Sequence, residues 1–359
     1  MTIPFLDLAA QFQTLRPEID QVISEVMQSG QYIGGEPVRK FEERIAQVHN
    51  VKHCVAVANG SDALYLALKA AGIGEGDEVI TTAFSWIATA AAISQTGATP
   101  VFSDVRRDNL QLDLLKAKGL LSPKTKAIVP VYLYGDLSHR ASYLDFALEH
   151  DLLLVEDAAQ VHGLPLPIES SRHLATFSFY PTKQLGAYGD AGAVICHDDQ
   201  LAEQVRRIAN QGALFPQQAY QVEGINSRMD TLQAAILTFK LPFLDSWITR
   251  RAEVAKSYQH AILGCTGIEG LAVSEAHTWY QFVVRAEDQN HFKQYLKGQR
   301  IGCATHYGYT LPGTVTYGQR KGYPVAEQAA TAVVSLPIYQ ELTDEQVAYV
   351  CESLIQYRR

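Results

Sequence analysis

The sequence predicts an α/β protein that has a mostly parallel sheet flanked by helices and, after it, a smaller C-terminal α/β domain. Two observations lead to this prediction. From about residue 50, short apolar runs bounded by glycine alternate with amphipathic helical runs, which is typical of βαβ units. At 359 residues, with 47% apolar and 19% charged residues, the chain is long enough for one large domain and a smaller one.

The expected elements follow one another along the first part of the chain. Strand-like runs occupy 54–59, 77–83, 126–135, 152–159, 176–180 and 192–198, and helical runs occupy 62–72, 85–97, 142–151 and 201–212. In open α/β sheets, ligands bind outside the carboxyl ends of the strands. Polar side chains that follow those ends are therefore the first candidates for a functional site.

A long helical pattern at 229–262 contains Pro242, which we expect to end or kink the helix. We place a domain boundary near this point, with a large domain at 1–245 that includes the N-terminal segment and a small domain at 246–359. The small domain is expected to contain a strand at 277–286, a helix at 290–299 and a closing helix from Asp344.

Composition limits the classes of partner. A net charge of −8 argues against a general binder of nucleic acid or of membrane surfaces, although local backbone amides can still bind an anion. Five scattered cysteines without a CxxC pair are typical of reduced thiols in the cytoplasm, and no metal site is expected. The first 30 residues lack a signal-peptide pattern, and the most apolar stretch, 86–93, is too short to span a bilayer. We therefore expect a cytoplasmic protein.

Lys183 lies between an apolar strand and a turn that contains Gly186, Gly189 and Gly192. Solubility does not require a lysine at this place. A lysine amine buried at such a site can act as a nucleophile and form a Schiff base with a carbonyl group. The alternative is an exposed lysine in an ordinary loop.

Asp157 ends an otherwise apolar strand, where a buried carboxylate is costly unless it is paired. A cation would satisfy this carboxylate, and the protonated pyridine nitrogen of pyridoxal 5′-phosphate (PLP) is one such cation. The alternative is that Asp157 caps the next turn. We expect His162, five residues later, to pack or to form a structural hydrogen bond rather than to act as an acid.

Gly60 and Ser61 form the turn between a predicted strand and a predicted helix. The glycine allows a ligand to approach the backbone, the serine can hydrogen-bond it, and the free N–H groups of the helix attract an anion. The turn is therefore a candidate phosphate site. The alternative is an ordinary helix start, with Ser61 as the N-cap and Asp62 in the first turn.

The chain resembles the sugar aminotransferases of the DegT/StrS type, a branch of the fold-type-I PLP enzymes, in four strings that occur in the family's order. The strings are NGSDALYLAL at 59–68, VEDAAQVHG at 155–163, FSFYPTKQLGAYGDAG at 177–192 and NSRMDTLQAAIL at 226–237. The likeness extends from PFLDLAAQF at residue 4 to VVSLPIYQELTDEQV, which ends at residue 347.

This resemblance implies a fold-type-I transaminase that moves an amino group from an amino acid, expected to be L-glutamate, to a keto group of a nucleotide-linked sugar. The expected product is an amino sugar, as in lipopolysaccharide O-antigen. The resemblance also implies a homodimer with shared sites, because Asn226 in GINSRMD matches a residue that reaches the phosphate of the neighbouring subunit. Asn226 could instead be a helix N-cap.

The other matching residues take roles from the same resemblance. Lys183 would bind the cofactor covalently and later move a proton between the substrate and the cofactor, and Asp157 would pair with the pyridine nitrogen. Gln160 would contact the ring hydroxyl. Trp86 would stack on the ring, with a core tryptophan as the alternative. The phosphate would be bound by Gly60, Ser61 and Ser178.

Two segments depart from the family pattern. The loop at 164–176 is short and contains prolines, whereas family members usually carry a longer, glycine-rich and basic loop there, so sugar or nucleotide contacts from it are in doubt. The HYP-x-P segment reads HYGYTLP. His306 and Tyr307, the candidate substrate-binding residues, are present, but Gly308 replaces the first proline, which could alter selectivity for the sugar.

The form NSRMDTLQAAIL favours a 3-keto sugar, since members that act on 4-keto sugars more often read N-x-RM(T/S)-x-IQAA. Two other functions compete. A dehydratase sub-branch of the family has histidine at the position of Lys183, so this lysine argues against dehydration. A PLP-binding regulator without catalysis is the second competitor. The filled cofactor positions and the lack of an attached DNA-binding segment argue against it.

Overall fold

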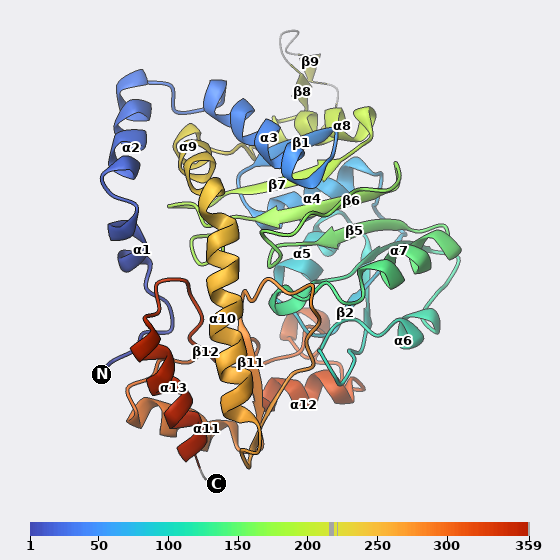
Figure 1. Ribbon diagram of the computed structural model, residues 1–359. Coiled ribbons are helices and arrows are strands. Elements are labelled where there is room, and N and C mark those ends of the chain that lie inside the picture. The colour runs from blue at the N-terminus through green and yellow to red at the C-terminus, as the bar shows by residue number, and fades with distance from the viewer. Residues whose placement is uncertain (215–218, 221, 358–359) are drawn as a thin grey trace.

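The computed structural model describes residues 1–214, 219–220 and 222–357, and a seven-stranded sheet forms the centre of its first part (Figure 1). In spatial order the strands are β1 (His53–Val57), β7 (Gly192–Cys196), β6 (His173–Ser178), β5 (Leu153–Asp157), β4 (Thr125–Val129), β2 (Glu78–Thr82) and β3 (Thr99–Ser103). The pairs from β6 to β3 are parallel, and only β7 runs antiparallel to its neighbours. The predicted α/β class with a mostly parallel sheet is confirmed.

Helices cover both faces of this sheet. On one face pack α4 (Gly60–Ala70), α5 (Ala88–Gln95) and α8 (Asp199–Ala209), and on the other pack α3 (Gly35–His49), α7 (Arg140–Glu149) and α9 (Thr231–Lys240). All five residues of β5 are buried, because successive side chains enter opposite layers: Leu154 faces the α3 side, and Leu153 and Val155 face the α4 side. Burial on both faces explains why the strands read as continuous apolar runs rather than alternating ones.

Smaller elements complete the first part of the chain. They are α1 (Leu8–Thr14), α2 (Glu18–Ser29), α6 (Leu114–Lys118), and the two-stranded sheet of β8 (Ala213–Leu214) and β9 (Ala219–Tyr220). None of the helices in the described ranges combines the length and the apolar character needed to cross a bilayer.

Pro242 interrupts the long helical pattern as predicted. Helix α9 ends at Lys240, a 3₁₀ turn at Leu241–Phe243 holds the proline, and α10 (Leu244–Ile262) begins directly afterwards. The proline ring lacks an N–H donor, so it is tolerated in the first turn of a helix but not in its interior.

The C-terminal part of the chain forms a second, antiparallel sheet with its own core. The sheet contains β10 (Ile268–Gly270), β11 (Phe282–Ala286) and β12 (Val333–Leu336), and around it lie α10, α11 (Gln289–Gly298), α12 (Pro324–Ala332) and α13 (Asp344–Gln356). Helix α13 begins at Asp344 as expected, with Thr343 and Gln346 forming a capping box. Ile3, at the other end of the sequence, packs into this core. The division at residue 245 stays a prediction.

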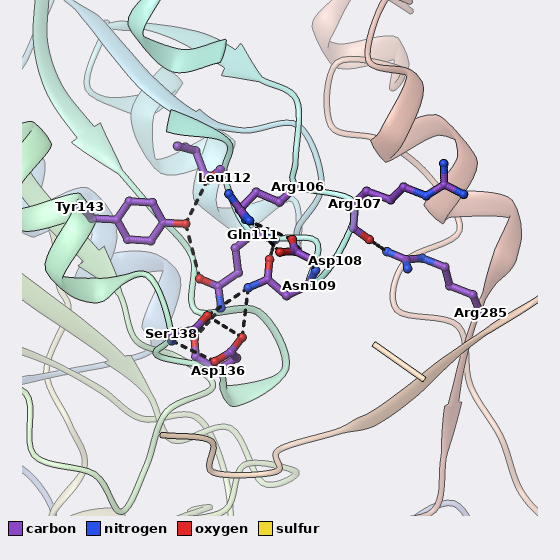
Figure 2. Close-up of polar contacts among 10 residues, drawn as sticks. All are labelled: Arg106, Arg107, Asp108, Asn109, Gln111, Leu112, Asp136, Ser138, Tyr143 and Arg285. Atoms are coloured by element: carbon purple, nitrogen blue, oxygen red, sulfur yellow. Dashed lines mark hydrogen bonds and ion pairs between the residues drawn. The ribbon is translucent and has the colours of Figure 1, made fainter. Parts of the chain in front are cut away.

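A polar junction joins the two parts beside the loops that follow β3 and β4 (Figure 2). The buried carboxylate of Asp136 accepts hydrogen bonds from Asn109 Nδ2 at 3.2 Å and from Ser274 Oγ at 2.7 Å. Arg285 of β11 donates to the backbone oxygen of Arg107. These contacts hold the second part of the chain against the carboxyl-end edge of the large sheet.

Candidate active site

A cavity of about 680 Å³ lies at the carboxyl ends of the parallel strands, which is a volume typical of small-molecule sites. Its lining brings together nine of the predicted site residues: Gly60, Ser61, Trp86, Asp157, Gln160, Ser178, Lys183, His306 and Tyr307. The tenth, Asn226, is not part of the lining. Residues from both ends of the chain therefore meet where the sheet topology predicts a ligand.

Lys183 lies in a tight turn that follows β6. Its backbone N–H donates to Tyr180 O at 2.8 Å, and Gly186 approaches this turn so closely that a Cβ there would lie 2.3 Å from Pro181 O. The lysine is half-buried, and its Nζ lies 4.4 Å from the centroid of the Tyr280 ring. The alternative of an exposed loop lysine is therefore wrong.

Asp157 is buried at the end of β5 and forms two hydrogen bonds. Thr89 Oγ1 donates to Oδ2 at 2.8 Å, and the Ala159 amide donates to Oδ1 at 3.2 Å. One oxygen thus caps the next turn, as the alternative proposed, while the carboxylate also lines the cavity. Burial raises the pKa of Asp157, although both hydrogen bonds and the charge of Lys183 oppose the rise. Within the described ranges Asp157 has no ion-pair partner, so a bound cation would stabilise it.

The turn between β1 and α4 presents hydrogen-bond donors to the cavity. Asn59, rather than Ser61, is the N-cap of α4, because its side chain accepts from the Asp62 amide at 2.8 Å. The alternative role of Ser61 as the cap is therefore wrong, and its exposed side chain lines the cavity. A Cβ on Gly60 would lie 2.5 Å from Ser178 Cβ, so only glycine allows this close approach to β6. Amides of a first helical turn have no intrahelical acceptor and attract anions.

Gln160 is held in one orientation by its neighbours. Its Oε1 accepts from the Tyr134 amide at 2.6 Å, and its backbone oxygen accepts from Thr278 Oγ1 at 3.1 Å and from Gln184 Nε2 at 3.1 Å. Because Oε1 already has a backbone partner, the side-chain NH₂ group remains to donate to a ligand. This arrangement fits an acceptor such as a ring oxygen.

Aromatic side chains also line the cavity. Trp86 is 55% exposed, so the alternative of a core tryptophan is wrong, and its ring centroid lies 5.9 Å from that of Tyr307. His306 forms a 2.9 Å hydrogen bond through Nδ1 with Ser335 Oγ. Burial and the positive charge of Lys183 lower the pKa of His306 to about 4, so the imidazole is neutral at neutral pH.

Asn226 is exposed, and its backbone pairs with Asn210. The N-cap of α9 is Asp230, so the alternative of Asn226 as a helix cap is wrong. Its predicted contact with the phosphate of a neighbouring subunit stays a prediction.

Two other predicted features lie outside the cavity lining. His162 is buried against Phe177 and Phe179 and bonds Gln184 Oε1 through Nδ1 at 3.2 Å, as expected for a structural residue. No residue of the loop at 164–176 lines this cavity among the described residues.

Eleven further lining residues were not predicted as site residues from the sequence, among them Thr89, Thr182 and Tyr280. Thr89 is a polar residue within the alanine-rich run at 88–92, which was the only available signal for it. Tyr280 lies more than 90 positions after Lys183, in a run that reads as an ordinary strand, and no spacing connects the two residues.

The donors and acceptors of the cavity fit the aldehyde, the ring nitrogen and the phosphate of PLP. The amine of Lys183 suits the aldehyde, the uncompensated Asp157 carboxylate suits a protonated ring nitrogen, and the donors of the β1–α4 turn suit the phosphate.

Comparisons with known proteins cover the whole chain. The DegT/DnrJ/EryC1/StrS aminotransferase family matches residues 13–355. The chain is 40% identical over 370 residues to a "Pleiotropic regulatory protein" of Geobacillus stearothermophilus. This match covers 100% of this chain and 99% of that protein. It is 38% identical over 365 residues to the dTDP-3-amino-3,4,6-trideoxy-alpha-D-glucose transaminase of Streptomyces venezuelae. This match covers 99% of this chain and 96% of that protein.

Solved structures show the same fold. DesV of S. venezuelae, in complex with a ketimine intermediate, has a TM-score of 0.95 at 38% identity and covers 99% of this chain and 98% of its own. NtdA from Bacillus subtilis, with bound cofactor PMP, has a TM-score of 0.89 at 26% identity and covers 98% of this chain and 84% of its own. Because the family model spans residues 13–355 and a relative is 38% identical over 99% of the chain, this chain belongs to the DegT/DnrJ/EryC1/StrS aminotransferase family.

Proposed function

We propose that the protein is a PLP-dependent aminotransferase that moves the amino group of L-glutamate to a keto group at C3 of a nucleotide-linked sugar. One observation supports this function most strongly. A buried carboxylate that has no ion-pair partner among the described residues, Asp157, lines the same cavity as the half-buried amine of Lys183. An amine that binds a carbonyl and an anion that holds a ring cation are the two groups that PLP chemistry requires.

Each predicted site residue has a defined role in this proposal. PLP, when bound, supplies a ring that withdraws electrons from the carbon bearing the amino group. Lys183 binds the cofactor through Nζ and carries the proton that must leave and return. Asp157 keeps the ring nitrogen protonated, and Gln160 donates to the ring oxygen. Gly60, Ser61 and Ser178 bind the phosphate, and Trp86 stacks on the ring.

The sugar class rests on the relatives. The S. venezuelae relative is named as a transaminase of a 3-amino sugar, and the NSRMDTLQAAIL string of this chain favours the same position. We assign His306 and Tyr307, which line the same cavity as the β1–α4 turn, to the sugar. A 4-keto nucleotide sugar is the second candidate, since within the chain's own sequence only this string separates the two classes.

One relative is named as a regulatory protein, so a PLP-binding protein without catalytic activity is another candidate function. Lys183 and Asp157 argue against it, because binding alone does not require a nucleophilic amine beside a buried carboxylate.

We place the protein in the cytoplasm, where five free cysteines stay reduced. The use of the product in O-antigen stays a prediction.

We further propose a homodimer in which Asn226 reaches the phosphate of the partner's site. Asn226 is exposed and lies outside its own cavity lining. Tyr32 is 49% exposed and Ile33 is 51% exposed, and both contact the segment that follows Asn226: Ile33 pairs with Asp230, and Tyr32 O accepts from the Thr231 amide. Exposed apolar side chains next to a functional segment are typical of a protein interface.

The test separates the candidates in two steps. L-Glutamate alone should shift the absorption band of the PLP-loaded protein, and a nucleotide sugar should then restore the original band. We expect a 3-keto sugar to restore it at least ten times faster than the 4-keto sugar on the same nucleotide. Faster restoration by the 4-keto sugar would reverse the assigned position. If no amino-acid donor shifts the absorption band, the protein binds PLP without acting as an aminotransferase.

A further inference from the structure

Tyr280 reaches the active-site cavity from the C-terminal part of the chain, just before β11. Its ring lies under the amine of Lys183, with Nζ 4.4 Å from the ring centroid. Its hydroxyl lies 3.4 Å from Thr182 Oγ1. Both residues also line the cavity, so a phenol and the amine that must react share one small volume.

The backbone that carries Tyr280 is strained and tightly held. Trp279 has φ = 52°, a left-handed conformation that a bulky residue rarely adopts. The buried guanidinium of Arg251 donates from Nη1 to Trp279 O at 3.2 Å and to Tyr280 O at 3.4 Å. The Thr278 amide donates to Gly135 O at 2.8 Å. Strain that the surroundings maintain in this way is characteristic of functional sites, which points to a role for the side chain it places.

The charges around Tyr280 favour ionisation of its hydroxyl. Burial alone would raise the pKa of Tyr280, but the charge of Lys183, the hydrogen bond with Thr182 and the charge of Arg251 outweigh burial and lower it. The charged and titratable groups that face the pair are Asp157 at the end of β5, His162, Arg251 on α10, and His306 and Tyr307 in the loop before β12.

Most of these neighbours are neutral near pH 7. Burial, together with the charge of Lys183, lowers the pKa of His162 to about 3 and that of His306 to about 4, and burial raises the pKa of Tyr307. Arg251 and Asp157 remain as the charges near the pair, one of each sign. Tyr280 is an ionisable residue whose ring the amine of Lys183 contacts directly.

We propose that Tyr280 is a further catalytic residue, a phenol that shares one proton with the amine of Lys183. Rotation of the lysine side chain would bring Nζ from the ring face to the hydroxyl oxygen. In the transfer, an N–H bond of the Lys183 ammonium breaks and an O–H bond forms on the Tyr280 phenolate, which gives a neutral amine and a neutral phenol. The reverse transfer restores the ion pair. In this role the Tyr280 phenolate stabilises the ammonium and receives the proton that Lys183 must lose before its amine attacks a carbonyl, and the role rests on the function proposed above for Lys183.

The test follows the amine itself in the full-length protein after removal of the cofactor. Lys183 is acetylated competitively from pH 6 to 10, and its labelling is measured by mass spectrometry. In Tyr280→Phe the ring remains but the oxygen that stabilises the ammonium is lost, so labelling should begin at lower pH. We expect at least a threefold faster labelling at pH 7, which corresponds to a shift of about 0.5 pH unit. Tyr309→Phe removes a phenol outside the cavity lining and should leave labelling unchanged.

An unchanged labelling profile in Tyr280→Phe, a shift to higher pH, or an equal shift in Tyr309→Phe would each overturn the proposal. A second measurement does not depend on that variant. Tyrosinate absorbance is followed against pH in the cofactor-free wild type and in Lys183→Ala. One tyrosine should ionise at lower pH in the wild type than in Lys183→Ala, because coupling between two sites is reciprocal. Identical titrations would also overturn it.

Neither measurement uses an amino acid or a sugar. The proton-sharing pair can therefore fail while the aminotransferase assignment stands, and a failed sugar panel would leave the evidence for the pair intact.

Discussion

Thr89 donates its hydroxyl hydrogen to Oδ2 of Asp157 across 2.8 Å, from the helix on one side of the cavity to the strand end on the other. Together with the Ala159 amide on Oδ1, this bond fixes the plane of the carboxylate. Both donors are neutral, so the negative charge is oriented but not compensated. The geometry is that of a site prepared for a cation.

Replacing Asp157 with asparagine keeps the size of the side chain and removes its charge. Asp157→Asn should still bind PLP, because the phosphate donors and Lys183 remain, but the half-reaction with L-glutamate should slow by about 100-fold or more. Stopped-flow absorbance of the loaded protein measures this rate. Asp190→Asn, which changes a carboxylate at the rim of the same cavity, is the matched control and should lose much less. A near wild-type rate in Asp157→Asn would reduce Asp157 to its role in the turn.

Borohydride reduction should attach the cofactor permanently to Lys183. The amine lines the cavity and faces the space that the cofactor would fill, so peptide mapping should find pyridoxyl phosphate on the peptide that contains this residue. Lys183→Ala should take up no covalent label. Label on any other lysine would end the assignment of the nucleophile.

The shared-site proposal predicts that two inactive variants regain activity when mixed. Lys183→Ala lacks the nucleophile, and Asn226→Asp places a carboxylate against the phosphate, where like charges repel. In a mixed dimer, one cavity would combine the wild-type Lys183 of one chain with the wild-type Asn226 of the other. Up to one working site per dimer should therefore return after subunit exchange.

The control for this experiment is each variant exchanged with itself, which should stay inactive. Native mass spectrometry should confirm the mixed dimer. If Asn226 served its own chain, both cavities of the mixed dimer would be defective, so a confirmed mixed dimer without activity would refute the shared site.

Lys240 predicts a pH dependence of stability. This fully buried lysine donates from Nζ to Gln11 Oε1 at 3.0 Å and to Gly186 O at 2.8 Å, and it lies 4.0 Å from the centroid of the Tyr188 ring. Burial lowers the pKa of Lys240 to about 7, although the charge of Glu341 opposes the shift.

The sign follows from proton uptake on unfolding. Below pH 7 the lysine is protonated in both states, and the full cost of burying the charge is present. Between pH 7 and the ordinary pKa of 10.5, the unfolded chain binds more protons, so stability rises with pH. Relative to Lys240→Met, the wild type should gain about 2 kcal/mol in the free energy of unfolding from pH 7 to pH 9, measured by urea titration. Lys256→Met, at an exposed position on α10, should show a constant difference from the wild type.

Several features of the protein were predictable because they depend on local sequence. The alternation of apolar strand runs and helices predicted the parallel sheet, and Pro242 and Asp344 marked helix boundaries that the structure confirms. The lining of one cavity by Gly60, Asp157 and Lys183 was also predictable. Each follows or ends a strand of the same sheet, and the carboxyl ends of parallel strands meet at one edge.

The sequence by itself thus determined the fold class and the residue types of the cofactor site, but only the tertiary structure decided how those residues are held and what closes the site. In the structure Asn59, rather than Ser61, caps α4, the hydroxyl of Thr89 donates to Asp157, and the ring of Tyr280 contacts the amine of Lys183. Strand and helix patterns arise from the periodicity of neighbouring residues, whereas these contacts join segments that are distant in the chain. A hydrogen-bond partner or a strained conformation such as that of Trp279 depends on which surfaces pack together, and no local spacing encodes that choice.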